Sequence, residues 1–194
     1  MRNILAVLFF AAVGLLLVKF LSSRASQRRT PSSEPPETSA EVGRTLRLKM
    51  LTTPPAQLGV TPTTEFPRVY GVLMDWPIDD QTATVFSASS GAASLYTTST
   101  FGIIGGEGHE AVRSAAMKFV RAADRYLDAA QSTTEYPYPN AHRVRFYFLT
   151  FEGVRLIDTD LASVSNNTGK YTELFGLGQA VLTELRLVTQ KRSK

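Results

Sequence analysis

The sequence contains no cysteine among its 194 residues. This absence excludes disulfide bonds, cysteine-ligated zinc, a thiol nucleophile and a lipid anchor on cysteine. Histidine is scarce as well, since His109 and His142 are the only two, and neither belongs to a set with the spacing of zinc ligands. Nothing in the chain resembles the sharp turn that presents a catalytic serine. We therefore predict no catalytic residue, no metal and no cofactor.

The central part of the sequence lacks an excess of positive charge, although the whole chain has a formal net charge of +4. Residues 66–189 carry ten basic and thirteen acidic side chains, and the basic excess lies in residues 1–65 and 190–194. A nucleic-acid-binding domain concentrates Lys and Arg on its folded surface. We therefore expect no nucleic acid among the partners.

Long apolar runs are confined to the N-terminus. Residues 4–21 are apolar or small except for Lys19, and a helix of that length spans about 27 Å, enough for a bilayer core. We predict that residues 1–21 form a transmembrane anchor or a signal segment. Cleavage of a signal peptide would follow Ala25. The length of the run and the arginine before Ala25 favour the retained anchor.

The charges that flank this run predict its orientation. Four basic residues lie within or just after it, and one precedes it: Lys19, Arg24, Arg28 and Arg29 against Arg2. The positive-inside rule then places the following domain on the cytoplasmic side. We expect a single-pass protein of the cell membrane that contacts the lipid bilayer through its N-terminal helix.

Residues 22–67 have the composition of a linker, rich in Ser, Pro, Glu and Arg. Residues 45–51 interrupt it, because Leu46, Leu48 and Met50 alternate with basic side chains. Such alternation is typical of a strand. We predict either an edge strand of the domain at 45–51 or a basic-apolar segment that lies on the bilayer surface.

Residues 68–189 are predicted to form a globular α+β domain, followed by a basic tail over 190–194. Apolar patterning predicts strands over 68–76, 82–88, 92–99, 143–151 and 154–159, and helices over 109–130 and 171–188. Short turns between the strands favour an antiparallel five-stranded sheet with two packed helices. The first strand is apolar on both faces, so we expect it in the centre of the sheet. The order of three strands, helix, two strands, helix is similar to that of the profilin-like and roadblock-like domains.

Two glycines, Gly176 and Gly178, lie inside the predicted C-terminal helix. Glycine costs a helix about 1 kcal/mol relative to alanine. We expect that close backbone contact with the sheet or with another helix compensates for this cost.

A glycine-rich loop between a strand and a helix is the only candidate ligand site. Gly106-Glu107-Gly108-His109-Glu110-Ala111 has the G-x-G-x-x-A outline of a dinucleotide-binding turn, in which backbone amides at a helix N-terminus hold a phosphate. The candidate ligand-binding residues are Gly105, Gly106, Gly108 and His109. Two glutamates and the antiparallel context oppose a dinucleotide there. The alternative is that the glycines only permit a sharp reversal of the chain.

The block SLYTTSTFGIIGGEGHEAVR, with LTTPPAQLG and YGVLMD before it, resembles a group of uncharacterised bacterial proteins that carry SLYxS…GGxIGxGxH blocks. The resemblance covers approximately residues 51–127, and we expect it to extend into the C-terminal half. Phe101 stands where that pattern has a further glycine. The resemblance implies no activity, cofactor or catalytic residue.

These patterns together predict a membrane-tethered, non-enzymatic interaction or assembly module. Its expected partners are the bilayer and either another protein or a second copy of the chain. The alternative is a small-molecule or anion-binding protein, or an enzyme, that uses the loop from Gly105 to His109.

Overall fold

The computed structural model of the chain describes residues 39–99 and 102–192. The predicted anchor, over residues 1–21, and the first part of the predicted linker lie outside the described residues. Within the described ranges, none of the helices combines the length and the apolar character that a bilayer crossing requires.

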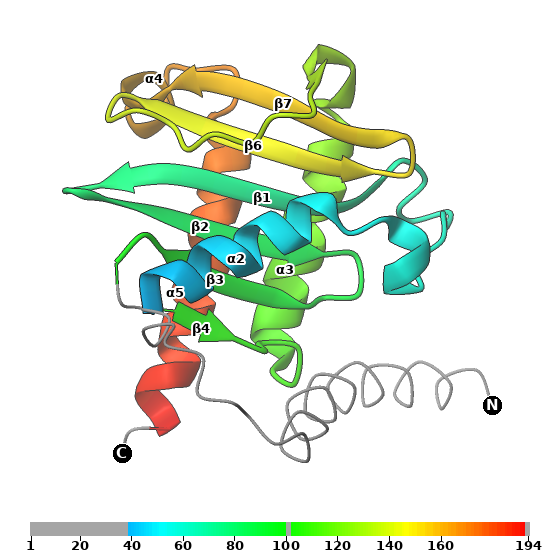
Figure 1. Cartoon of the computed structure of the whole chain (residues 1–194), viewed down its shortest axis with the longest axis horizontal. Helices are drawn as coiled ribbons and strands as arrows, with labels where there is room; N and C mark the ends of the chain where they lie inside the picture. The colour runs from blue at the N-terminus through cyan, green and yellow to red at the C-terminus, as the bar shows by residue number, and fades with distance from the viewer. Residues whose placement is uncertain (1–38, 100–101, 193–194) are drawn as a thin grey trace, which may run out of the picture. The chain divides into compact units, whose positions relative to one another are not determined.

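One antiparallel sheet of seven strands forms the centre of the described unit (Figure 1). Its strands are β1 (Val69–Ile78), β2 (Gln81–Ala88), β3 (Ala93–Thr97), β4 (Gly102–Ile104), β5 (Gln131–Ser132), β6 (Arg143–Thr150) and β7 (Gly153–Asp160). They lie in the order β4-β3-β2-β1-β6-β7-β5. The helices are α2 (Ser39–Thr52), α3 (Glu110–Asp124), α4 (Leu161–Ser165) and α5 (Thr172–Arg192), with short 3₁₀ turns at Pro55–Leu58 and Leu127–Ala129.

Strand β1 is the central strand, as predicted from its two apolar faces. It pairs with β2 on one side and with β6 on the other. Its residues from Val69 to Trp76 are all buried. Buried β-branched, aromatic and aliphatic side chains on both faces are what a strand covered on both sides requires.

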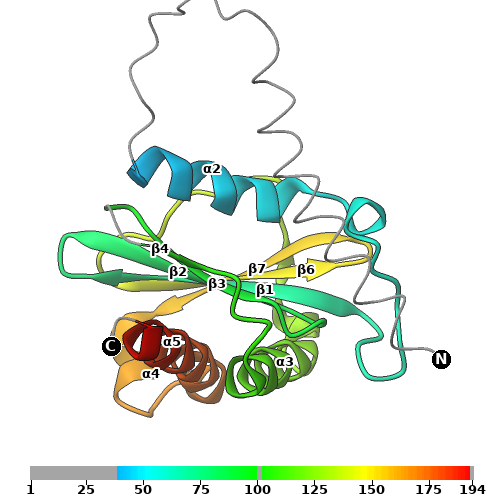
Figure 2. The ribbon, with the colours of Figure 1, turned by 90° about the horizontal axis from the view of Figure 1, so that it is seen from below.

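The helices divide between the two faces of the sheet. Helices α3 and α5 cover one face and α2 crosses the other, as Figure 2 shows. The larger core lies under α3 and α5, where Met74, Phe119 and Val181 are fully buried. A smaller core lies under α2 and contains Leu73 and Tyr147. The sheet therefore has apolar contacts on both sides.

The predicted five-stranded sheet is wrong, because the sheet has two further strands. Strand β4 lies between the predicted strand at 92–99 and the predicted glycine loop that begins at Gly105, and it pairs with β3 through Ile103 and its neighbours. Strand β5 follows α3 and pairs over two residues with β7. Both strands are too short to show the alternation on which strand prediction depends, and their pairing depends on backbone hydrogen bonds to distant segments.

The predicted edge strand at 45–51 is also wrong, because this segment belongs to helix α2. The alternation of apolar residues concealed a second pattern at helical spacing, in which Gly43, Arg47 and Leu51 form the buried row. Leu, Arg, Lys and Met are good helix formers. Because the middle residue of the buried row is charged, the apolar pattern of the sequence does not indicate a helix here.

The two predicted helices exist, with different ends. Helix α3 stops at Asp124 and a 3₁₀ turn follows it, whereas the prediction extended to residue 130. Helix α5 continues to Arg192 and so includes most of the predicted basic tail. A Cβ atom added at Gly178 would lie 2.4 Å from Met74 Cε, which confirms the expected close packing, but one added at Gly176 would meet nothing within 4 Å.

Candidate functional site

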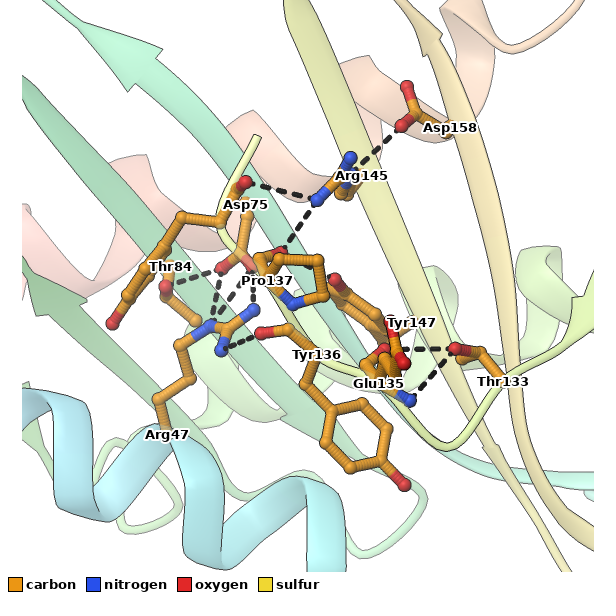
Figure 3. Close-up of polar contacts among 11 residues, drawn as sticks. Arg47, Asp75, Thr84, Thr133, Glu135, Tyr136, Pro137, Arg145, Tyr147 and Asp158 are labelled. Carbon is orange, nitrogen blue, oxygen red and sulfur yellow. Dashed lines mark hydrogen bonds and ion pairs between the residues drawn. The ribbon is translucent and has the colours of Figure 1, made fainter. Parts of the chain in front are cut away.

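A buried ion pair joins α2 to the centre of the sheet (Figure 3). Asp75 lies in the middle of β1 on the face toward α2, and Arg47 lies in the middle of α2; both side chains are almost fully buried. Arg47 Nε lies 3.0 Å from Asp75 Oδ2 and 3.3 Å from Oδ1, and Arg47 Nη2 lies 2.5 Å from Oδ2. The forked contact fixes the position of α2 on the sheet.

Groups from three other segments complete the surroundings of this pair. Thr84 of β2 donates its hydroxyl to Asp75 Oδ1 at 2.5 Å. The carbonyl of Tyr136 accepts a hydrogen bond from Arg47 Nη1 at 2.9 Å. The Arg47 guanidinium lies 4.2 Å from the ring centre of Tyr138 and 5.4 Å from that of Tyr147, within cation–π range. The pair is therefore neutralised and hydrogen-bonded within the fold.

The electrostatics of the pair are dominated by burial and by mutual attraction. Burial raises the pKa of Asp75, and the charge of Arg47 and the hydrogen bonds from Arg47 and Thr84 oppose that rise. Burial lowers the pKa of Arg47, but the charge of Asp75 and the hydrogen bonds to it, with the nearby tyrosines, together hold that pKa above its ordinary value. Each of the two charges is neutralised by the other, and α2 shields both from solvent. The arrangement is therefore a structural clamp and has no exposed reacting group. We call Arg47 and Asp75 the clamp.

A second set of charges holds the loop that passes beside the clamp. Arg145 of β6 and Arg143 both donate to Asp158 of β7, with Nε–Oδ distances of 2.8 and 2.6 Å. Arg145 Nη1 also donates to the carbonyl of Pro137 at 2.9 Å, and Tyr147 Oη donates to the same carbonyl at 2.7 Å. The loop around Pro137 is therefore fixed against the α2 face of the sheet.

A cleft of about 630 Å³ lies at the C-terminal end of α2. Its walls come from the end of α2, the start of β1, the segment after β5 and the turn between β6 and β7. The lining residues include Thr53, Tyr70, Ser132, Thr134, Tyr136, Glu152 and Arg155. We call this the α2–β5 cleft. It presents the half-buried ring of Tyr136 and several hydroxyl groups, which suit binding by stacking and hydrogen bonding.

Tyr136 links the cleft to the clamp. Its side chain lines the cleft, its carbonyl accepts from Arg47, and its ring packs edge-on against Tyr147 at 5.9 Å. On the opposite wall, burial raises the pKa of Tyr70 to about 12, so its phenol is a neutral hydrogen-bonding group at physiological pH. The shape of the cleft therefore depends on where the clamp holds α2.

Two of the predicted ligand residues, Gly105 and Gly106, have clear structural roles. Gly105 has φ +82°, which favours glycine, and ends β4. A Cβ atom at Gly106 would lie 2.5 Å from Val112 Cγ1 and 2.8 Å from Leu185 Cδ2, so the chain passes between α3 and α5 only without a side chain. Chain reversal and close packing account for both glycines.

Gly108 and His109 lie at the start of α3. A Cβ atom at Gly108 would have no neighbour within 4 Å. His109 is the N-cap residue, but its side chain makes no capping hydrogen bond. Arg113 donates to the carbonyl of Glu107 at 3.1 Å and pairs with Glu110, so a cation of the chain itself faces this loop. The four predicted residues therefore all lie in the single turn that connects β4 to α3.

Among the residues that the structure describes, no group of three or more His, Asp or Glu side chains is placed to hold a metal ion. Comparisons of the chain with family models, with curated proteins and with solved structures give no match. No family is assigned to the chain. Its function has to follow from the clamp, the cleft and the surface.

Sequence analysis missed the clamp and the cleft, although one signal for the clamp was present. Asp75 is a charge inside a strand that was predicted to be buried on both faces. A buried carboxylate requires a partner, and arginine is the residue best suited to supply it. The cleft gave no signal, because its walls come from four short segments distant in sequence.

Proposed function

We propose that the described domain is a non-enzymatic interaction module that binds an extended segment of a partner protein in the α2–β5 cleft. The observation that carries this proposal is the cleft itself, whose wall is fixed by a buried clamp and whose lining offers a tyrosine ring and hydroxyls. Preformed walls reduce the ordering cost of binding. The two charges of the clamp already neutralise each other, which favours a structural role for them over a catalytic one.

The chemistry of the lining favours a polypeptide over other ligands. Tyr136, which is half-buried, provides an amphipathic surface of the kind enriched at protein interfaces, and Tyr70 lies buried beneath the opposite wall. Ser132 belongs to β5, which is the last strand of the described sheet, so its outer backbone edge lies beside the cleft. An extended peptide can pass along this edge while its side chains enter the adjacent cleft.

The location of the module at a membrane is a further part of the proposal. It is supported by the apolar run at 4–21 alone. Deletion of residues 1–29 removes this run and leaves the compact unit that begins at Glu37. We expect the shortened protein to move from the membrane fraction to the soluble fraction. Unchanged fractionation would contradict the tether.

Site-specific photo-crosslinking of the full chain in cells tests the cleft. A benzophenone amino acid at Ser132 is expected to yield a discrete crosslinked protein, and the same group at exposed Thr183 on α5 serves as the control. Adding Thr134→Arg, which fills the cleft, is expected to remove the crosslink at position 132. Equal crosslinking at both positions, or none at position 132, would overturn the proposal.

A further inference from the structure

Within the described residues, the edge of the sheet at β4 carries neither charge nor proline, and its shortness, three residues, is the one protection common to edge strands that it has. Strand β4 is the last strand of the described sheet on its side, and its sequence is Gly102-Ile103-Ile104. It contains no charge, no proline and no lysine, the usual means by which an edge avoids pairing with another chain. Ile104 is 64% exposed, more than any other large apolar side chain among the described residues.

The opposite edge of the sheet differs from β4. Strand β5 has only two residues, Gln131 and Ser132, and both are polar. A two-residue edge offers little backbone for pairing, and the chain leaves it at once to form the wall of the cleft. Of the two edges of the described sheet, only β4 therefore presents apolar side chains.

We propose that β4 pairs antiparallel with β4 of a second copy of the chain, which joins the two sheets across a twofold axis. This inference goes beyond the proposed function, because β4 and the cleft lie at opposite edges of the described sheet. Antiparallel pairing of a strand with itself is an isologous contact, the commonest interface of soluble oligomers.

The orientation of the side chains restricts the register. Ile103 pairs with Leu95 on the face of α3 and α5, whereas Ile104 pairs with Ser94 on the face of α2. Directly opposite residues of paired strands share a face. If both copies keep their helices on the same side, either Ile103 lies opposite Ile103 of the second copy or Ile104 lies opposite Ile104. The first register pairs all three residues of β4 and places each Ile104 opposite Gly102, which leaves room for its side chain, so we infer the first.

Helix α5 extends the same contact into the helical layer. Leu185 packs at Gly106, immediately after β4, and the last turns of α5 continue past β4 in Figure 1. Leu187 on these turns is 44% exposed. Pairing of the β4 edges therefore also brings the exposed apolar ends of two α5 helices toward each other, and both layers contribute to one interface.

Two charge substitutions test the inference in the full chain. Light scattering of the detergent-solubilised protein is expected to give a dimer mass after subtraction of the detergent. Ile104→Lys places a charge at the edge and is expected to weaken dimerisation at least tenfold. Leu48→Lys on the outer face of α2, where Leu48 is 51% exposed, is the matched control and is expected to leave the dimer intact.

Three outcomes would overturn the inference: a monomeric parent protein, an unchanged dimer in Ile104→Lys, or equal weakening in both variants. A monomer whose Ile104 amide is protected from hydrogen exchange would mean that another segment of the same chain covers the edge, which also overturns it. The far-ultraviolet spectrum of each variant confirms that it is folded.

Introduced cysteines test the register, because the chain has none of its own. Residues directly opposite have Cβ atoms about 5 Å apart and diagonal residues about 7–8 Å apart, and a disulfide requires about 4 Å. Ile103→Cys is therefore expected to form an intermolecular disulfide under mild oxidation faster than Ile104→Cys, and Leu48→Cys is expected to form none. Faster crosslinking at Ile104 than at Ile103 would contradict the register.

The outcomes separate this inference from the proposed function. The cleft and β4 lie at opposite edges of the described sheet. A monomer that still crosslinks from Ser132 removes only the twofold contact. A dimer that loses no crosslink when Thr134 is changed to Arg removes only the cleft as the partner site.

Discussion

Arg47 and Asp75 lie 28 positions apart in the chain and meet in a forked ion pair whose side chains are 4% and 0% exposed. One belongs to the helix on the outer face of the sheet and the other to its central strand. The pair gives α2 a unique position on a sheet face that apolar contacts alone would hold less specifically.

Loss of one partner of the clamp is predicted to destabilise the fold strongly. Arg47→Met keeps a similar volume but leaves the Asp75 carboxylate buried without a counterion, so the free energy of unfolding is expected to fall by about 3–5 kcal/mol. Trp76, the only tryptophan, is buried beside Asp75 and reports unfolding in urea through its fluorescence.

The double variant Arg47→Met with Asp75→Asn provides the control for this prediction. The double variant leaves no buried charge without a partner. Its unfolding free energy is therefore expected to be well above the value calculated by adding the losses of the two single variants. Strict additivity would show that the two side chains do not act as a pair.

Stability at acidic pH is predicted to depend on Asp158. Burial raises the pKa of Asp158, but hydrogen bonds from Arg143 and Arg145 outweigh it and hold this pKa below its ordinary value. A carboxylate whose folded-state pKa is lowered contributes stability above its unfolded pKa of about 3.9, and that contribution is lost as the pH falls through the folded-state pKa.

Urea unfolding at pH 5 and at pH 2.5 measures this contribution. The parent protein is expected to lose about 1 kcal/mol more between these values than Asp158→Asn, because the carboxylate is partly exposed and its ion pairs are screened. Asp80→Asn, in the exposed turn between β1 and β2, is the control and is expected to behave like the parent. An identical loss in Asp158→Asn would refute the role of the ion pairs.

The glycine loop is predicted to respond differently at two neighbouring positions. Gly106→Ala forces a methyl group against Val112 and Leu185 and is expected to cost about 1–3 kcal/mol of stability. Gly108→Ala meets open space and is expected to change stability by about 0.5 kcal/mol or less. Chemical denaturation compares the two variants, and an equal cost at Gly108 would mean that close packing is not what selects glycine here.

The two glycines of α5 offer a second matched comparison. Gly176→Ala is expected to stabilise the protein by about 0.5–1 kcal/mol, since it restores helix propensity at a position with free space. Gly178→Ala has the same gain in propensity but pushes its methyl group against Met74 and Phe119. We expect its thermal midpoint to lie below that of Gly176→Ala, and the reverse order would contradict the packing of α5 on the sheet.

The sequence predicted those parts of the fold that have a long apolar period. The α+β class, the central position of β1 and the existence of α3 and α5 follow from apolar spacing over eight or more residues. Helix α2 was not predicted, because its buried face centres on Arg47 and a charged residue is normally expected at the surface. Strand β4 was not predicted, because two isoleucines between glycines are too few to show the alternation of a strand.

The candidate site could be predicted only in part, for a physical reason. The glycine loop is local in sequence, and its tight turn could be inferred from Gly105 and Gly106. The clamp required knowing which helix lies over Asp75. The cleft required the folding together of segments near residues 53, 70, 134 and 153, whose polar side chains show no pattern until the sheet brings them side by side.

Helix α2 is the first described element of the chain and is fastened to the middle of the sheet. A mechanical load applied at its N-terminal end, as by a tether, is transmitted through the clamp to β1. Because β1 is hydrogen-bonded on both sides, such a load shears the strongest part of the fold and does not unzip an edge strand. A pull from the N-terminal side would therefore act first on the clamp and the central strand of the sheet.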